Sequence, residues 1–558
     1  MKEVTVNGKV KSYAGFTIGP IYEVLLHARK TREMWFGSYF FSWYMEDLVN
    51  RLSKTTGIEI ISPYFDKSKY PNTTRIGRYN DRIVLQSFTK TPEQLIDIIS
   101  RANRTVFSDF VNLIDKLATE GSNYISGKSK SDIENILKNY LQTNFIVLPA
   151  AEIVERDAVK TIYAYLDATE LHRHYEYGKC NPTCQRCLSL PAVMSATLSG
   201  DKKPSSLCPL CFIKYFCHLS NDIKTKARNF TRYPSTGEIA AADIVQVAGK
   251  KMDEYLQGID ELNFDDKEFR TLITTRKIEA YHKYMAILMA DGDNMGTLAK
   301  SLGGPQQFSR KIYGYIDQAA EICQHYGKKT GLLYGEPIYL GGDDILAFLP
   351  VAVQDNNEIR TIMDVAIALS EEFKKDMESI NVDEDKDQKK SSLSMGVAIT
   401  YYKHPLSFTL QRARELLGIS KNTQGKNALT LQLTKHSGHT GRFTLQFGTD
   451  RISIYAGLLR SVLSTQNKVL MYTIQHNLAR FEKLLISISE RQQLDNFFEI
   501  NFEGADYPGI AEVKELLATI YDFDCAGKTL KQEKEIKKEF REIMNMLWLI
   551  KFLSGGDQ

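Results

Sequence analysis

The chain has 558 residues, and at about 150 residues per domain this length predicts three or four domains, each large enough for its own core. Hydrophobic residues make up 43% of the chain and charged residues 25%, which excludes a largely disordered protein. With 71 basic and 68 acidic residues the formal charge is only +3, so any contact with nucleic acid must use a local patch. No apolar run approaches the roughly 18–20 residues that cross a membrane, and residues 1–10 lack a secretion signal, so we expect a cytoplasmic protein without membrane contact.

The first 150 residues alternate predicted strands with two long amphipathic helices. In chain order these elements cover 15–18 (strand), 21–52 (helix), 57–61 and 82–86 (strands), 91–118 (helix) and 144–148 (strand). The order β-α-β-β-α-β predicts a ferredoxin-like domain over residues 1–150. The predicted strand ends of this domain carry no acidic residues.

The next region, residues 151–280, holds a cluster of cysteines. Six of the eight cysteines lie between Cys180 and Cys217. Two Cys-x-x-Cys pairs with twenty residues between them, Cys184/Cys187 and Cys208/Cys211, have the spacing of a tetrahedral thiolate site, so we expect one structural Zn²⁺ in a helical domain. Four thiolates leave no open coordination position, so this site should not be catalytic. The alternative ligands are His174, Cys180, Cys217 and His218.

Basic and aromatic residues alternate around and after the cysteine pairs. The basic ones are Lys202, Lys203, Lys214, Lys224, Lys226, Arg228 and Arg232, and the aromatic ones are Phe212, Tyr215, Phe216, Phe230 and Tyr233. Such a surface can hold an RNA backbone or stack a base. A solvated basic face over a small zinc core explains the pattern equally well, and both interpretations stay open.

Residues 281–437 repeat the strand and helix order of the first domain. The predicted elements are a buried strand at 284–290, helices to about 300 and over 305–326, strands at 337–340 and 345–349, a helix over 358–380, a strand at 393–400, a helix over 405–417 and a strand at 428–433. The order is again β-α-β-β-α-β, extended by α-β. Residues 438–558 are predicted to be nearly all helix from about 451 onward.

Acidic residues stand at two neighbouring strand ends of this second domain. Asp291 follows the buried strand at 284–290, and Asp343 and Asp344 close the hairpin between 337–340 and 345–349. In a split β-α-β sheet the first strand lies beside this hairpin, so the carboxylates should converge. Converging carboxylates repel one another unless divalent cations lie between them. We therefore expect two Mg²⁺ or Mn²⁺ ions about 4 Å apart and a nucleoside triphosphate, with Asp291, Asp343 and Asp344 as the catalytic residues. Adjacent strand residues point to opposite faces, so Asp291 and Asp343 are the expected direct ligands and Asp344 is either a third ligand or a partner of one.

Other residues of these motifs are candidates for binding the nucleotide. Glycine lacks a Cβ atom, so a nucleotide can approach the backbone closely at such positions. Lysine supplies a positive charge for a triphosphate. The candidates are Gly292, Asp293, Gly296, Gly341, Gly342, Lys421 and Lys426. A plain hairpin or turn also explains each motif taken alone.

These segments resemble the large, polymerase/cyclase-like Gly-Gly-Asp-Asp subunit of type III CRISPR effector complexes, and most closely the III-B branch. The resemblance rests on Ile18-Gly19-Pro20-Ile21, Ala28-Arg29-Lys30-Thr31-Arg32, Trp35-Phe36-Gly37-Ser38, Asp291-Gly292-Asp293-Asn294-Met295-Gly296, Gly341-Gly342-Asp343-Asp344 and Lys403-His404-Pro405-Leu406. It implies an α+β multidomain chain: two ferredoxin-like palm domains of the nucleotidyl cyclase type, a zinc-binding helical domain and a C-terminal helical domain. The first palm is then inactive, since Gly19-Pro20 takes the place of Asp291-Gly292.

The resemblance also implies an activity and partners. ATP would be converted to a nucleotide second messenger when a target RNA pairs with the guide RNA, within a complex of several subunits. Relatives often carry a nuclease domain with an adjacent His-Asp pair, but the sequence contains no His-Asp dipeptide, so we expect no DNase activity by that route. Some relatives without that domain join an adenylyl group to S-adenosylmethionine, so the product is either a cyclic oligoadenylate or such a conjugate.

Two other functions remain alternatives. One is a non-catalytic scaffold that organises guide RNA and partner subunits; intact acidic residues at both strand ends argue against it. The other is a signalling enzyme like the diguanylate cyclases, which share a segment similar to Ser420–Asn427; the zinc module and the inactive first palm disfavour it.

Overall fold

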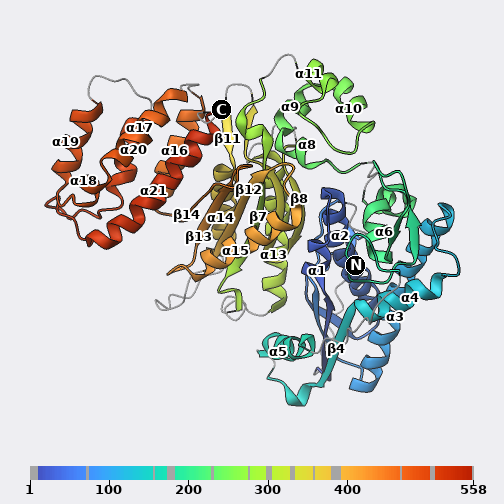
Figure 1. Cartoon of the computed structure of the whole chain (residues 1–558). Coiled ribbons are helices and arrows are strands. Elements are labelled where there is room, and N and C mark those ends of the chain that lie inside the picture. The colour runs from blue at the N-terminus through green and yellow to red at the C-terminus, as the bar shows by residue number, and fades with distance from the viewer. Residues whose placement is uncertain are drawn as a thin grey trace.

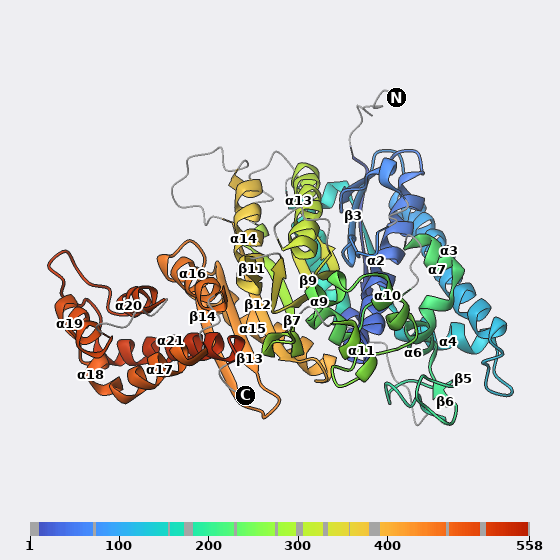
Figure 2. The ribbon, with the colours of Figure 1, turned by 90° about the horizontal axis from the view of Figure 1, so that it is seen from above.

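The computed structural model describes residues 10–70, 74–154, 157–171, 182–227, 232–273, 277–296, 305–326, 333–355, 358–378, 391–464, 468–502 and 509–555. The two larger sheets lie side by side in the middle of the molecule, as Figure 1 shows. The helices of the first sheet stand at one end of the molecule, and a group of C-terminal helices stands at the other end. Figure 2 shows the same succession from above. None of the helices within the described ranges combines the length and apolar composition needed to cross a bilayer.

The first sheet has the strand order β2-β3-β1-β4. Its strands are β1 (Ser12–Gly19), β2 (Ile58–Ser62), β3 (Arg82–Ser87) and β4 (Gln142–Pro149), and its helices are α1 (Ile21–Leu26), α2 (Thr31–Ser53), α3 (Pro92–Glu120) and α4 (Lys130–Tyr140). All its strand pairs are antiparallel, so the expected ferredoxin-like order is confirmed. The single helix expected over 21–52 is interrupted between α1 and α2.

This first domain extends beyond the expected boundary at residue 150. Helix α5 (Ala158–Glu170) packs against β1 and β4. The contact is so close that a Cβ atom on Gly15 would lie 2.3 Å from the Ile162 side chain. Helix α5, which falls within the residues 151–280 expected to form the zinc-binding helical domain, therefore packs with the first sheet instead.

The second sheet has six strands in the order β14-β13-β12-β7-β9-β8. The strands are β7 (Tyr284–Asp293), β8 (Glu336–Gly341), β9 (Asp344–Pro350), β12 (Ser392–Tyr401), β13 (Ala428–Thr434) and β14 (Thr440–Gln446). Four of them, β8-β9-β7-β12, repeat the order of the first sheet. Strand β14 pairs antiparallel with β13, so the boundary expected at residue 437 is wrong.

The faces of the second sheet are covered by different helices, α13 (Pro305–His325), α14 (Ile362–Glu378) and α15 (Leu406–Asn422). Alternate residues of β7 point to opposite faces: Ala286 joins the core beneath α13 and α14, and Ile287 joins the core that holds α15. The helix expected over 358–380 is shorter, because β10 (Ala352–Asp355) and β11 (Glu358–Thr361) form a hairpin before α14 begins.

The remaining regions are mostly helical. In the chain, the segment between the two sheets forms β5 (Met194–Ala196), β6 (Ser205–Leu207), α6 (Pro209–Phe216), α7 (Asn221–Lys226), α8 (Thr236–Ala240), α9 (Ala242–Val247), α10 (Lys250–Gln257) and α11 (Lys267–Leu272). The C-terminal helices are α16 (Asp450–Ser464), α17 (Lys468–Arg480), α18 (Glu482–Ile486), α19 (Arg491–Phe502), α20 (Ile510–Ala518) and α21 (Glu533–Leu553). Helix α21 packs on β14 and so joins this group to the second sheet.

Candidate active site and metal centre

The register of β7 and β9 brings the acidic strand ends together. The last pair of the antiparallel ladder is Ala290 opposite Ile345. The next residues along the two strands are Asp291 and Asp344, and Asp291 lies near enough for its charge to raise the pKa of Asp344. Asp343 lies beside them, since a Cβ atom on Gly292 would be 2.8 Å from the Asp343 Cβ.

The hairpin that carries Asp343 is a tight turn whose glycines are required by its geometry. Gly341 pairs with Asp344, which leaves Gly342 and Asp343 as the two central residues. Gly342 has φ +72°, the conformation that the first central position of such turns requires. At Gly341 a Cβ atom would lie 2.0 Å from the Tyr339 hydroxyl oxygen, so Tyr339 packs where a side chain would stand.

Burial and mutual repulsion perturb the hairpin carboxylates. Burial and the charge of Asp291 raise the pKa of Asp343 to about 6. Burial, followed by the charges of Asp343 and Asp291, raises the pKa of Asp344 well above its ordinary value. Asp344 is nevertheless exposed to water, although many protein atoms lie around its carboxylate. Repulsion of this kind is relieved when a divalent cation binds, and carboxylates are ligands that Mg²⁺ and Mn²⁺ prefer. Among the described residues, however, only the four cysteines discussed below already lie close enough together to hold an ion.

Lys421, at the end of α15, forms an ion pair with Asp291. Both side chains are about one-third exposed, at 29% and 33%. Lys421 therefore partly neutralises the acidic group from the side on which a triphosphate was expected. Lys426 follows in a turn and lines the same pocket as Lys421.

Asp293 has a different place from the one expected beside the nucleotide. Its side chain is fully buried. One carboxylate oxygen accepts hydrogen bonds from the hydroxyls of Ser392 and Ser394, both at 2.7 Å, and from the Asn427 N–H at 3.1 Å. This carboxylate ties the end of β7 to β12 and to the loop before β13. Its described contacts are structural, and its assignment to the nucleotide stays a prediction.

Two pockets flank the acidic residues. One, of about 780 Å³, is lined by Lys421, Lys426 and the residues around Ser392. The other, of about 770 Å³, lies between the two sheets and is lined by Asp343, Gly342 and Gly296 on one side and by first-domain residues on the other. Both volumes are in the range of small-molecule sites, about 300–1,000 Å³.

The first domain contributes residues that the sequence patterns did not single out. Asp81 directly precedes β3, the strand equivalent to β9, and its charge helps to raise the pKa of Asp344. The expectation that the first domain lacks acidic residues at its strand ends is therefore wrong at Asp81. Arg82 and Tyr163 line the pocket between the sheets, with the Arg82 guanidinium 5.4 Å from the centre of the Tyr163 ring.

The two Cys-x-x-Cys pairs form one compact cluster. The Sγ atoms of Cys184, Cys187, Cys208 and Cys211 all lie within 4.8 Å of one another. Tetrahedral zinc–thiolate bonds of about 2.3 Å place sulfur atoms about 3.8 Å apart, and the Cys187–Cys208 Sγ distance is 3.9 Å. The predicted set of residues therefore comes together with the dimensions of a zinc site.

The alternative ligands do not join this cluster within the described part of the chain. Cys217 donates to the Lys214 carbonyl at 3.5 Å, and His218 lines a separate pocket. His174 and Cys180 lie outside the described residues.

The basic and aromatic surface expected around the zinc module is smaller than its sequence suggests. Lys214 is buried and donates to the Val24 carbonyl at 2.8 Å, and Phe212 and Tyr233 belong to the core. Arg228 and Phe230 lie outside the described residues.

Comparisons with known proteins agree with the architecture. Residues 284–430 match the family model described as Cas10/Cmr2, second palm domain, and residues 13–112 match CRISPR-associated protein Cmr2, N-terminal. The CRISPR system Cmr subunit Cmr2 of Pyrococcus furiosus is 34% identical over 185 residues, which cover 28% of this chain and 19% of that protein. The match therefore spans about a fifth of the length of this curated relative.

Solved structures show the same fold at low sequence identity. A chain of a type III-B Cmr-beta assembly in the apo state is 12% identical with a TM-score of 0.57, over 99% of this chain and 82% of that chain. A chain of Cmr-beta bound to cognate target RNA is also 12% identical, with a TM-score of 0.55 over 100% and 84%. Both family models point the same way: the chain is similar to the Cas10/Cmr2 family over residues 284–430 and 13–112.

Proposed function

We propose that this chain is a metal-dependent nucleotidyltransferase of the cyclase type that converts ATP into a nucleotide second messenger. The observation that carries the proposal is that Asp291, Asp343 and Asp344 stand at the same end of the neighbouring strands β7 and β9 and that the pKa values of the two hairpin carboxylates are raised. A purely structural hairpin gains nothing from three carboxylates that repel one another.

Asp291, Asp343 and Asp344 would hold two Mg²⁺ or Mn²⁺ ions. When bound, such ions lower the pKa of an attacking hydroxyl and stabilise negative charge on a leaving pyrophosphate. A ribose hydroxyl, or another acceptor, attacks the α-phosphorus of ATP; the bond to the β-phosphate oxygen breaks and pyrophosphate leaves. Lys421 lies where it can exchange its contact with Asp291 for a contact with the triphosphate.

The two flanking pockets suit a donor and an acceptor. The pocket with Lys421 and Lys426 would take the triphosphate of the donor ATP. The pocket between the sheets, bordered by Asp343, would present the acceptor, which is either a second adenosine nucleotide or S-adenosylmethionine. The product would accordingly be a cyclic oligoadenylate or an adenylyl conjugate of S-adenosylmethionine.

We infer that the chain works within a type III-B CRISPR complex, with guide RNA and target RNA as regulators of the site. The similarity to the Cas10/Cmr2 family supports this inference, and a structural neighbour of the same fold is a complex with cognate target RNA. The cluster of Cys184, Cys187, Cys208 and Cys211 would hold one structural Zn²⁺ that fixes the loops between the two palms.

The decisive experiment incubates the assembled complex with ATP, Mn²⁺ and complementary target RNA, with and without S-adenosylmethionine, and identifies products by mass spectrometry. We expect a new adenylate product and pyrophosphate in wild type and none in Asp343→Ala with Asp344→Ala, although RNA binding persists. Synthesis retained by the double variant would place the active site elsewhere. No product under any condition would favour a scaffold, and a product from GTP alone without RNA would favour a diguanylate-cyclase-like enzyme.

A further inference from the structure

The first domain reaches across to the catalytic sheet through residues 75–79, here called the bridging segment. Strand β8 is the outermost strand of the six-stranded sheet, and Gly77 forms a parallel bridge on its open edge. The Gly77 N–H donates to the Ile338 carbonyl at 3.1 Å, and the Leu340 N–H donates to the Gly77 carbonyl at 2.8 Å. The backbone contact between the two domains therefore reaches Leu340, which lies three residues before Asp343.

Side chains on both sides of Gly77 extend this contact. The Arg75 guanidinium lies 3.6 Å from the carboxylate of Glu336 at the start of β8. Arg78 donates to Asp317 of α13 at 2.6 Å. Ile76, only 5% exposed, is buried in the core of the second domain. Four consecutive residues of the first domain thus bind the second one.

Helix α2 of the first domain fixes the position of the bridging segment. The Trp35 indole N–H donates to the Arg75 carbonyl at 2.6 Å. The Ser42 hydroxyl accepts hydrogen bonds from the backbone N–H groups of Arg78 and Tyr79, at 2.7 and 2.8 Å. Trp35 is fully buried and Ser42 is 3% exposed, so both anchors belong to the rigid interior of the first domain.

The space around Gly77 shows how closely the two domains fit. A Cβ atom at this position would lie 3.1 Å from the Ser42 Cβ and 3.3 Å from the Tyr339 ring. The bridging segment therefore fills the gap between α2 and β8 without room for even a methyl group.

We propose that the bridging segment positions the Gly341–Asp344 hairpin for the reaction, with Ser42 and Arg75 as positioning residues. An edge strand bonded only to β9 can shift or fray at its end, whereas β8 is bonded on both sides up to Leu340. Metal ligands must stay within about 0.5 Å of their productive geometry. The kinetic part of this inference rests on the proposed function, but the structural part does not.

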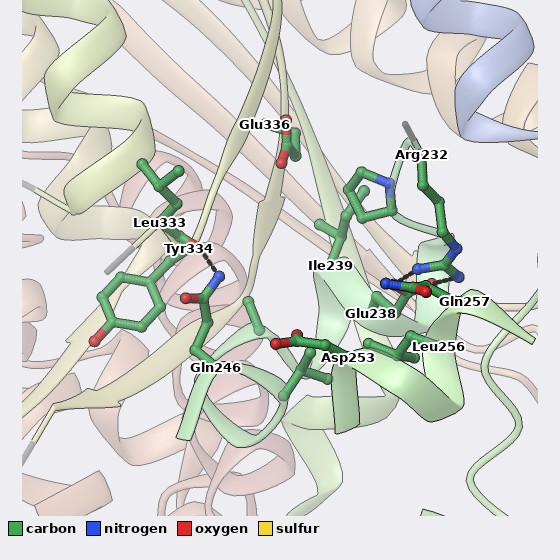
Figure 3. A pocket seen from close by; sticks show the side chains of 13 residues that line it. Arg232, Glu238, Ile239, Gln246, Asp253, Leu256, Gln257, Leu333, Tyr334 and Glu336 are labelled. Carbon is green, nitrogen blue, oxygen red and sulfur yellow. Dashed lines mark hydrogen bonds and ion pairs between the residues drawn. The ribbon is translucent and has the colours of Figure 1, made fainter. Parts of the chain in front are cut away.

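The ion pair between Arg75 and Glu336 offers a reversible test, because Glu336 borders open space. Figure 3 shows Glu336 on the wall of a pocket of about 390 Å³, with Ile239 and Gln246 among the other lining residues. A longer side chain at position 336 can therefore extend into this pocket, so the charges can be exchanged by Arg75→Glu with Glu336→Arg.

The experiment measures hydrogen exchange and ATP turnover in the full chain. In Ser42→Ala the amides of β8 and the hairpin should exchange about tenfold faster than in wild type. The rate constant kcat should fall about tenfold, with KM for ATP changed less than about twofold, because binding residues are untouched. Arg75→Ala should show the same pattern, and the exchanged pair should restore both readouts. The matched control is Ser38→Ala, one turn earlier on α2 and equally buried at 4%, which should resemble wild type.

If the β8 amides exchange in both Ser42→Ala and Arg75→Ala at the same rate as in wild type, the proposal is overturned. Equal acceleration in Ser38→Ala would also overturn it, because the effect would then be a general loss of packing. Faster exchange with unchanged kcat in an active enzyme would refute the positioning role. If wild type makes no nucleotide product, the proposed function fails, and the exchange rates still decide whether the bridging segment holds the hairpin.

Discussion

Replacing Asp343 by asparagine should make the metal-free protein more stable while it removes activity. The side chain keeps its shape and loses its charge. Burial and Asp291 raise the pKa of Asp343 to about 6, against an ordinary value of 3.8. A raised carboxyl pKa means that the folded state resists ionisation, so stability falls as the pH rises from about 4, where the unfolded chain ionises, to about 6, where the folded state ionises, and is level above that.

The size of this effect follows from the shift. About two pKa units correspond to an upper bound of about 3 kcal/mol. Asp343 keeps some contact with water and shares its repulsion with Asp291 and Asp344, so we expect about 1–2 kcal/mol for Asp343→Asn above pH 6. For a domain of this size that is a rise of about 3–6 °C in Tm. Below about pH 4 the aspartate is protonated in both states, and the two proteins should unfold alike.

The assay is thermal unfolding between pH 4 and 8 in EDTA, repeated with Mn²⁺. Wild type should gain stability with Mn²⁺, and Asp343→Asn should gain much less. The control is Asp97→Asn, the same change at an exposed ion pair on α3, which should alter stability by less than about 0.5 kcal/mol. Asp343→Asn that is less stable than wild type at pH 7.5 without metal would refute the reasoning.

Three further changes test other parts of the site. Lys421→Ala removes the cation that pairs with Asp291, so Mn²⁺ should bind a few-fold more tightly while kcat/KM for ATP falls about tenfold. Isothermal titration would measure the Mn²⁺ affinity and steady-state kinetics would measure kcat/KM. If neither value changes, Lys421 is only a solvated residue. Asp293→Ala leaves one buried and two half-buried donors without their acceptor and should cost about 2–4 kcal/mol of unfolding free energy in urea; a normally stable variant with a raised KM for ATP would support the nucleotide-binding interpretation. Cys184→Ser with Cys208→Ser should lower zinc from about one ion per chain to near zero in elemental analysis, with a lower Tm; full zinc content would mean that other ligands hold it.

Much of the fold follows from patterns that are local in the sequence. Buried strands such as 284–290 are continuous apolar runs, and the short Gly-Gly-Asp-Asp connection allows only a hairpin. Strand β14 was missed although its residues alternate between exposed and buried, which is the pattern of a half-buried strand. Its pairing is set by contact with β13 and by α21, which no local pattern records.

In the candidate site, too, features set by local sequence patterns were predictable and features set by contacts distant in the chain were not. Asp291 and Asp343 were predictable because each directly adjoins a buried strand of a recognisable β-α-β-β order. The role of Asp293 was not, because its hydrogen-bond donors lie about 100 or more residues away in the chain, at Ser392, Ser394 and Asn427. Asp81 was missed because it is a single acidic residue beside Arg82, and only the three-dimensional fold carries it to the second domain's hairpin.

The carboxylates of Asp291, Asp343 and Asp344 push β7 and the hairpin apart whenever no cation lies between them. Three restraints oppose that force from different directions. The β7–β9 ladder holds the strands laterally, buried Asp293 ties the end of β7 to β12, and the bridging segment holds β8 from the first domain. None of the three restraints uses a carboxylate of Asp291, Asp343 or Asp344, so binding a cation leaves them intact and its free energy appears as relief of repulsion. Loosening any one restraint should therefore weaken the acidic site even though the altered residue never touches a cation or ATP.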